Sequence, residues 1–153
     1  MYSVKEAVGK LGLPAFIAIV VIIFVVIASV LPCERAFQNH IFSGTITISA
    51  GGYYDIPFTW GDNFRLLGSF TASGGSENDI VVLILVDSAY TNWVSGHEVT
   101  ALYSSGQVAE GTFNVPITIS STHTYHVVYS NRFSTSTKRV TTTVNIEYHH
   151  IYD

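Results

Sequence analysis

Residues 139–148 read RVTTTVNIEY, and apolar and polar side chains alternate along this stretch. A period of two residues is typical of a β-strand with one buried face, because successive side chains of a strand point to opposite faces. The alternation therefore predicts a strand across residues 139–148. The predicted inner face of this strand carries Val140, Thr142, Val144, Ile146 and Tyr148.

The same period recurs in the preceding hundred residues. At residues 44–49 the chain reads GTITIS, with Ile46 and Ile48 on one face, and Gly51-Gly52 follows as a turn signal. Residues 88–107 are less regular and predict a long connection with one short strand, without helical periodicity. Further strands are predicted at residues 53–58, 65–72, 79–86, 112–119 and 125–129. About seven strands with turn signals between them predict an all-β fold, an antiparallel β-sandwich.

A long apolar segment precedes the strands. Residues 13–31 contain no charged side chain, and as a helix this segment measures roughly 28 Å, close to the ~30 Å hydrocarbon core of a bilayer. A buried core helix would show a polar stripe, and this segment is apolar on every side. It is also longer than the apolar region of a signal peptide and ends in Val30-Leu31-Pro32, a poor cleavage site. We therefore expect a single uncleaved transmembrane helix at residues 13–32.

Flanking charges predict the orientation of this helix. Lys5 and Lys10 precede it, whereas Arg35 alone follows closely, so the positive-inside rule favours a cytoplasmic N-terminus. The expected organisation is a cytoplasmic segment at 1–12, the helix at 13–32, a linker at 33–42 and a β-sandwich domain outside the cytoplasm at 43–153. The predicted location is the cell membrane, with a single pass through the lipid bilayer.

Two other interpretations of the N-terminal region remain open. Lys10-Leu11-Gly12 before an apolar helix resembles the processing site of archaeal pilins and archaellins, which makes a structural filament subunit the alternative function. A mature protein that starts at Leu13 would favour that alternative, and an intact Met1 would favour the anchor. Cys33 suggests a lipoprotein site, although proline stands where a small residue is expected. It is the only cysteine, so an intrachain disulfide is excluded.

The sequence predicts no catalytic, cofactor-binding or metal-binding residues. A blue-copper site needs a cysteine beside histidines, and Cys33 is distant in sequence from every histidine pair. His123 and His126 are three residues apart on a strand, which puts them on opposite faces. No Gly-x-Ser-x-Gly motif occurs, and the acidic residues are spread singly. The histidines are His40, His97, His123, His126, His149 and His150.

The charge balance bears on the partners of the domain. After residue 32 the chain carries five basic and ten acidic side chains, a balance that disfavours binding to nucleic acid. Lipid and other protein subunits are the expected partners.

The segment from Gly111 to Ile146 resembles the last strands of the GOLD (Golgi dynamics) domain found in small transmembrane cargo receptors of the early secretory pathway. In that family a strand is followed by a serine- and asparagine-containing turn, a lysine and an alternating strand. Here the matching positions are Ser130-Asn131-Arg132-Phe133-Ser134 and Lys138, and Gly111-Thr112-Phe113 matches the preceding strand entry. The motif is structural. The Asn131 side chain suits a turn because it can hydrogen-bond the nearby backbone, and the serine hydroxyls can hydrogen-bond exposed backbone groups.

The resemblance implies a GOLD-like sandwich that mediates protein or lipid contacts and has its two final strands joined as a hairpin. Those receptors also carry a cysteine pair, a coiled coil and a C-terminal anchor, whereas here the anchor comes first, as would suit an archaeal surface protein. Cargo reception is therefore not implied. The sequence predicts a non-enzymatic, membrane-anchored accessory or adaptor subunit of a larger membrane or envelope assembly.

Replacing Ile22 with arginine tests the anchor. A charge near the middle of the bilayer costs about 2.5–3.5 kcal/mol on insertion scales, so we expect reduced insertion. The measurement is the fraction of protein that stays with membranes after a carbonate wash. Retention equal to that of the wild type would contradict the predicted anchor.

Overall fold

The structure is a computed structural model that describes residues 33–118 and 121–152. The chain divides into two compact units, and residues 36–150 form the unit that contains the sandwich. Across the described ranges no helix is long and apolar enough to cross a membrane. The predicted transmembrane helix at 13–32 lies outside the described residues.

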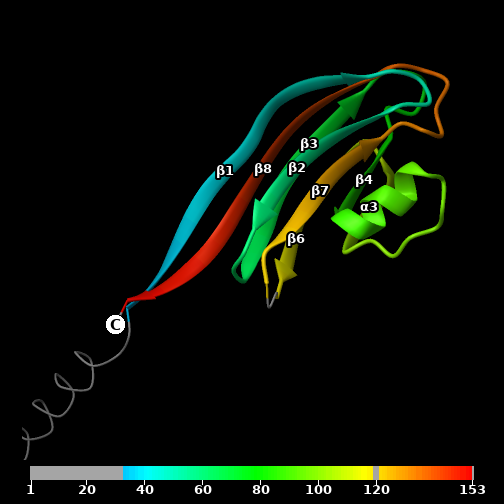
Figure 1. Cartoon of the computed structure of the whole chain (residues 1–153). Coiled ribbons are helices and arrows are strands. Elements are labelled where there is room, and N and C mark those ends of the chain that lie inside the picture. The colour runs from blue at the N-terminus through cyan, green and yellow to red at the C-terminus, as the bar shows by residue number, and fades with distance from the viewer. Residues whose placement is uncertain (1–32, 119–120, 153) are drawn as a thin grey trace, which may run out of the picture. The chain divides into compact units, whose positions relative to one another are not determined.

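In the described residues, eight strands and one helix follow one another (Figure 1). Strand β1 begins within the segment expected to be a linker, so residues 33–42 are extended and paired in a sheet. The elements are β1 (Cys33–Ile48), β2 (Tyr53–Trp60), β3 (Phe64–Ser73), β4 (Ile80–Val86), α3 (Asp87–Val94), β5 (Tyr103–Val108), β6 (Glu110–Ile117), β7 (His123–Ser130) and β8 (Lys138–Tyr152).

The strands form two four-stranded sheets, with the orders β1-β8-β3-β6 and β2-β7-β4-β5. The expectation of an all-β sandwich is therefore confirmed, with eight strands where about seven were expected. Consecutive strands mostly alternate between the two sheets, and only β4 and β5 are neighbours in both sequence and sheet. This strand order is that of a double-sheet jelly roll.

The core lies between the two sheets and consists of the alternating apolar positions. Ile46 and Ile48 of β1 and Val140, Val144 and Ile146 of β8 are all buried, as the alternation predicts. Tyr125, Val127 and Tyr129 of β7 meet them from the other sheet. Deep in this core the Tyr129 hydroxyl lies 2.6 Å from the Thr142 hydroxyl, which in turn donates to the Ser69 carbonyl at 2.8 Å.

Two glycines make room for phenylalanine rings within the core. Gly68 of β3 faces Phe113 of β6 in the strand register, and a Cβ atom at Gly68 would collide with the Phe113 ring. The reverse arrangement occurs two residue pairs along, on the same face of the sheet, where a Cβ at Gly111 would lie 2.9 Å from the Phe70 ring. Glycine is needed at both positions because the opposite ring fills the space of a side chain.

The segment between β7 and β8 differs from the predicted hairpin. The two strands belong to different sheets, so residues 131–137 cross from one sheet to the other. The Asn131 side chain does form the expected turn bonds, because its Nδ2 donates to Ser136 O at 2.8 Å. Lys138 opens β8 as expected, and its buried ammonium lies 2.9 Å from the Asp79 carboxylate. This ammonium holds the pKa of Asp79 below its usual value, chiefly through the hydrogen bond.

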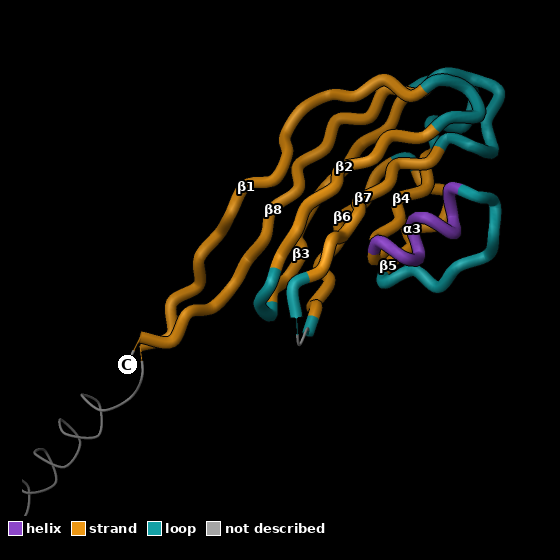
Figure 2. Tube along the Cα trace, in the orientation of Figure 1, coloured by secondary structure: helices purple, strands orange, loops and turns teal. Residues whose placement is uncertain are grey.

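The helix α3 is a further difference from the sequence prediction, because no helix was expected within residues 88–107. Figure 2 shows this helix in purple beside the strands of one sheet. It is eight residues long and its first turn has no side-chain cap. A helix this short is not stable alone and depends on tertiary contacts. The helix contacts β4 and β7. Ile84 and Val127 face the core, so their neighbours Leu85 and Val128 face the opposite side of the sheet. Leu85 and Val128 are nevertheless fully buried, because α3 covers that side.

Val144→Asp and Thr141→Asp test the two faces of β8. Val144 is fully buried, so an aspartate there places an unpaired carboxylate in the core, and we expect a loss of several kcal/mol, comparable with the stability of a small domain. Thr141 is exposed, and its change should cost about 0.5 kcal/mol. Urea unfolding measures both. Equal losses from the two variants would contradict the assignment of the faces.

Candidate functional site

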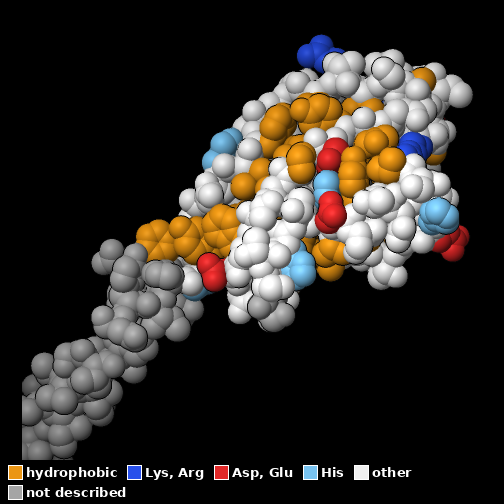
Figure 3. All heavy atoms as spheres, viewed as in Figure 1, with side chains coloured by type: hydrophobic (Ala, Val, Ile, Leu, Met, Phe, Trp, Pro, Cys, Tyr) orange, Lys and Arg blue, Asp and Glu red, His pale blue; other side chains and the backbone are white. Residues whose placement is uncertain are grey.

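The outer face of the β2-β7-β4-β5 sheet carries a cluster of charged and aromatic side chains around α3. On the face of the molecule shown in Figure 3, acidic and histidine side chains form a short line between two apolar patches. The cluster combines three parts of the chain that are far apart in sequence. Its members are Tyr53, Asp55, Asp87, Tyr90, Trp93, His126 and Arg132.

His126 lies at the centre of this cluster and contacts two carboxylates. Its Nδ1 lies 3.0 Å from Asp55 Oδ2 on β2, and its Nε2 lies 3.3 Å from Asp87 Oδ1 at the start of α3. The His126 side chain is 7% exposed and that of Asp55 18%. Each ring nitrogen faces a carboxylate, and only the doubly protonated imidazolium donates to both. The imidazole therefore joins the helix to the sheet.

Tyr90 covers the His126 ring. The two rings are nearly parallel, at 5°, and their centroids are 3.9 Å apart. Burial raises the pKa of the Tyr90 hydroxyl, and a hydrogen bond with Tyr53 and the charge of Asp55 raise it further. Tyr90 is thus a neutral phenol at physiological pH, and its ring shields His126 from solvent.

Arg132 fixes the other end of α3. Its Nη1 donates to the Trp93 carbonyl at 2.9 Å, and its guanidinium lies 3.8 Å from the centre of the Trp93 ring. The Tyr53 ring lies 5.0 Å from the same guanidinium and contacts Trp93 edge to face. A cation at a helix C-terminus satisfies free carbonyls and interacts favourably with the helix dipole. The helix is therefore held at both ends.

Neither ring nitrogen of His126 is free to act on a substrate in this arrangement. A general base needs a nitrogen that can reach a substrate proton, and both nitrogens of His126 are engaged under the Tyr90 ring. No group of three or more His, Cys, Asp or Glu side chains that could hold a metal ion occurs in the part of the chain that the structure describes.

The other histidines are spread over the domain. His40 contacts Asn145 at 3.0 Å, and His123 contacts Ser121 at 3.1 Å. His97 and His149 are exposed. The side chains of His150 and Cys33 lie outside the described part of the chain. The expectation that His123 and His126 point to opposite faces agrees with their separate surroundings.

Sequence reasoning missed the cluster, although one signal was present. Asp87, Tyr90 and Trp93 are spaced three residues apart, which places them along one side of a helix. The signal was hidden because the segment is short and polar residues fill the other positions.

His126→Phe tests the link between α3 and the sheet. Phenylalanine keeps a ring against Tyr90 but removes the imidazole that the largely buried Asp55 carboxylate contacts, so we expect a loss of about 1–3 kcal/mol in unfolding free energy. Amide hydrogen exchange in α3 should also accelerate. The matched control is His97→Phe at an exposed loop position, with an expected effect within about 0.5 kcal/mol. Unchanged stability and exchange in His126→Phe would show that the imidazole does not hold the helix.

Comparisons with known proteins do not assign the chain to a family. No family model matches it, and neither does any curated protein. Among solved structures, the crystal structure of the Yersinia pseudotuberculosis-derived mitogen is similar over 80% of this chain and 89% of that chain, with 12% sequence identity and a TM-score of 0.37. At that TM-score the similarity supports no conclusion about function. The resemblance to the GOLD domain stays a prediction.

Proposed function

We propose that the protein is a non-enzymatic, membrane-anchored β-sandwich that acts as an accessory or adaptor subunit of a larger membrane or envelope assembly. In this proposal residues 13–32 hold the chain in the lipid bilayer, and the domain outside the cytoplasm contacts a protein partner. The contact is made by what we name the α3 surface, which consists of the side chains of Tyr53, Asp55, Tyr90, Trp93, Val94 and Arg132.

The observation that carries the proposal is the composition of the α3 surface. Tyrosine, tryptophan and arginine are the residues that dominate binding energy at protein interfaces. Here they occur together in a small area, with Tyr53 37% exposed and Val94 39% exposed.

The rigidity of the α3 surface supports the same conclusion. Binding costs free energy when loose side chains become ordered, and a preorganised surface avoids part of that cost. Trp93 is held between Arg132 and Tyr53, and Tyr90 is stacked on a buried imidazole. A partner would therefore meet side chains that already occupy fixed positions.

Site-specific photo-crosslinking tests the proposed contact. The full-length chain is produced in its native membrane with a photoreactive amino acid in place of Val94 on the α3 surface, or in place of Thr71, an exposed position on the other sheet. We expect a covalent adduct of one discrete mass from position 94 and none from position 71. The Arg132→Ala exchange should reduce the adduct several-fold, because it frees the Trp93 ring.

Two outcomes would contradict the proposal. Equal adducts from positions 94 and 71 would show that the α3 surface has no preferred role. An adduct with the mass of two copies of this chain would favour the filament subunit, in which identical chains pack against one another.

A further inference from the structure

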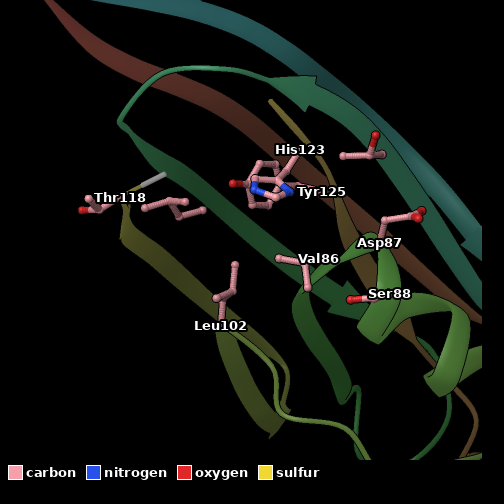
Figure 4. A pocket seen from close by; sticks show the side chains of 9 residues that line it. Val86, Asp87, Ser88, Leu102, Thr118, His123 and Tyr125 are labelled. Carbon is pink, nitrogen blue, oxygen red and sulfur yellow. The ribbon is translucent and has the colours of Figure 1, made fainter. Parts of the chain in front are cut away.

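One end of the sandwich holds an open cavity of about 400 Å³. Five parts of the chain meet there: the end of β4, the start of α3, the residue before β5, the end of β6 and the start of β7. Figure 4 shows side chains from these elements arranged around the cavity, including Leu102, Val86, Thr118 and Tyr125. The cavity lies beside the first turn of α3, and Asp87 is the one member of the His126 cluster that lines it.

The walls of the cavity are mainly apolar. Val86, Ile117 and Leu102 supply aliphatic surface, and Tyr125 supplies an aromatic ring. Leu102 is 46% exposed, which is the largest exposed fraction among the exposed large hydrophobic side chains of the described residues. Exposed apolar surface that lines a cavity is typical of ligand sites, because a ligand removes it from water.

The walls are also fixed in place. The Leu102 amide donates to the Ile84 carbonyl at 2.8 Å, which ties the lip of the cavity to β4. The Tyr125 ring is 1% exposed and stacks on Phe58, with ring centroids 5.5 Å apart. Burial raises the pKa of the Tyr125 hydroxyl, so this wall is a neutral phenol at physiological pH. A ligand would find a preformed site.

The polar groups around the cavity define the charge of its ligand. Ser88, Thr118 and Thr124 contribute hydroxyls, and His123 contributes an imidazole. Neither lysine nor arginine lines the cavity among the described residues, so an anion would lose its hydration without gaining a cationic partner. The nearest carboxylate, Asp87, already contacts His126, so an ammonium group would have to compete for it. An uncharged molecule with a hydroxyl or carbonyl group has no such cost.

We propose that this cavity is a binding site for a small, uncharged organic molecule with a flat apolar ring system and one hydroxyl or carbonyl group. A dry apolar cavity of about 150 Å³ holds a benzene molecule, so the volume at this site suits a compound of two fused rings. The ring system packs mainly against the accessible side chains of Leu102 and Val86, and the polar group bonds the hydroxyls at the rim. The site is independent of the proposed protein contact at the α3 surface.

Three probes with the same ring system and different charges test the proposal. They are 2-naphthalenemethanol, which is uncharged, 2-naphthoate, which is an anion, and 2-naphthylmethylammonium, which is a cation. Each is titrated into the full-length chain, and methyl NMR follows Val86, Leu102 and Ile117. The methyl groups of Ile48, which lies beside Asn131 at another part of the core, are the internal control.

We expect saturable shifts at the cavity methyls with 2-naphthalenemethanol, with a dissociation constant of about 1 mM or tighter. The two charged probes should bind at least about tenfold more weakly. Leu102→Trp should fill the cavity and abolish the shifts of Val86 and Ile117 without unfolding the chain, because Leu102 is partly exposed. The matched control is Thr71→Trp, which adds the same ring at an exposed position on the other sheet, outside the cavity.

Three results would overturn the proposal. The first is the absence of saturable shifts with the uncharged probe. The second is equal binding of all three probes, which would show that the cavity does not select for charge. The third is binding to the Leu102→Trp variant as tight as to the wild type, which would place the ligand elsewhere.

Discussion

The fold depends on a single buried amide, the side chain of Asn131. Its Nδ2 donates to Ser49 O at 2.9 Å and to Ser136 O at 2.8 Å, and its backbone amide donates to Gly52 O at 2.9 Å. These carbonyls belong to the β1–β2 turn and to the β7–β8 segment, and both of these connections cross between the sheets. A buried amide that bonds several carbonyls satisfies backbone groups that would otherwise be costly to bury. One side chain therefore closes the sandwich at this end.

The β2-β7-β4-β5 sheet is stabilised in different ways at the end near Asn131 and on its outer face. Near Asn131 the backbone is held by amide and carbonyl groups, whereas along the outer face an added helix covers the sheet. This cover allows six successive residues of β7, Tyr125–Ser130, to be buried. His126 and Ser130 are the buried polar side chains of this run, and the Asp55 and Asp87 carboxylates supply the partners that the buried His126 imidazole needs. The α3 surface and the cavity both arise from the placement of this helix.

The strands could be predicted from the sequence, and their arrangement could not. The alternation at residues 44–49 and 139–148 correctly assigned Ile46, Val140 and Val144 to the core, because a half-buried strand has a period of two whatever its neighbours are. The β7–β8 connection was predicted as a hairpin because its turn residues do not reveal which sheet the next strand joins. The helix was missed since its stability comes from His126 and Arg132, more than thirty residues away. The same separation hid the α3 surface, and no pattern in the sequence indicates the cavity.

The paired glycines and phenylalanines of β3 and β6 have a consequence for how this chain can diverge. Gly68 faces Phe113, and Gly111 faces Phe70, so each strand supplies one ring and one gap to the other. A mutation that adds a side chain at either glycine is tolerated only after the opposite ring has become smaller. The four positions are therefore expected to change in pairs during evolution, and related sequences should keep the sum of the two facing volumes nearly constant while the individual residues vary.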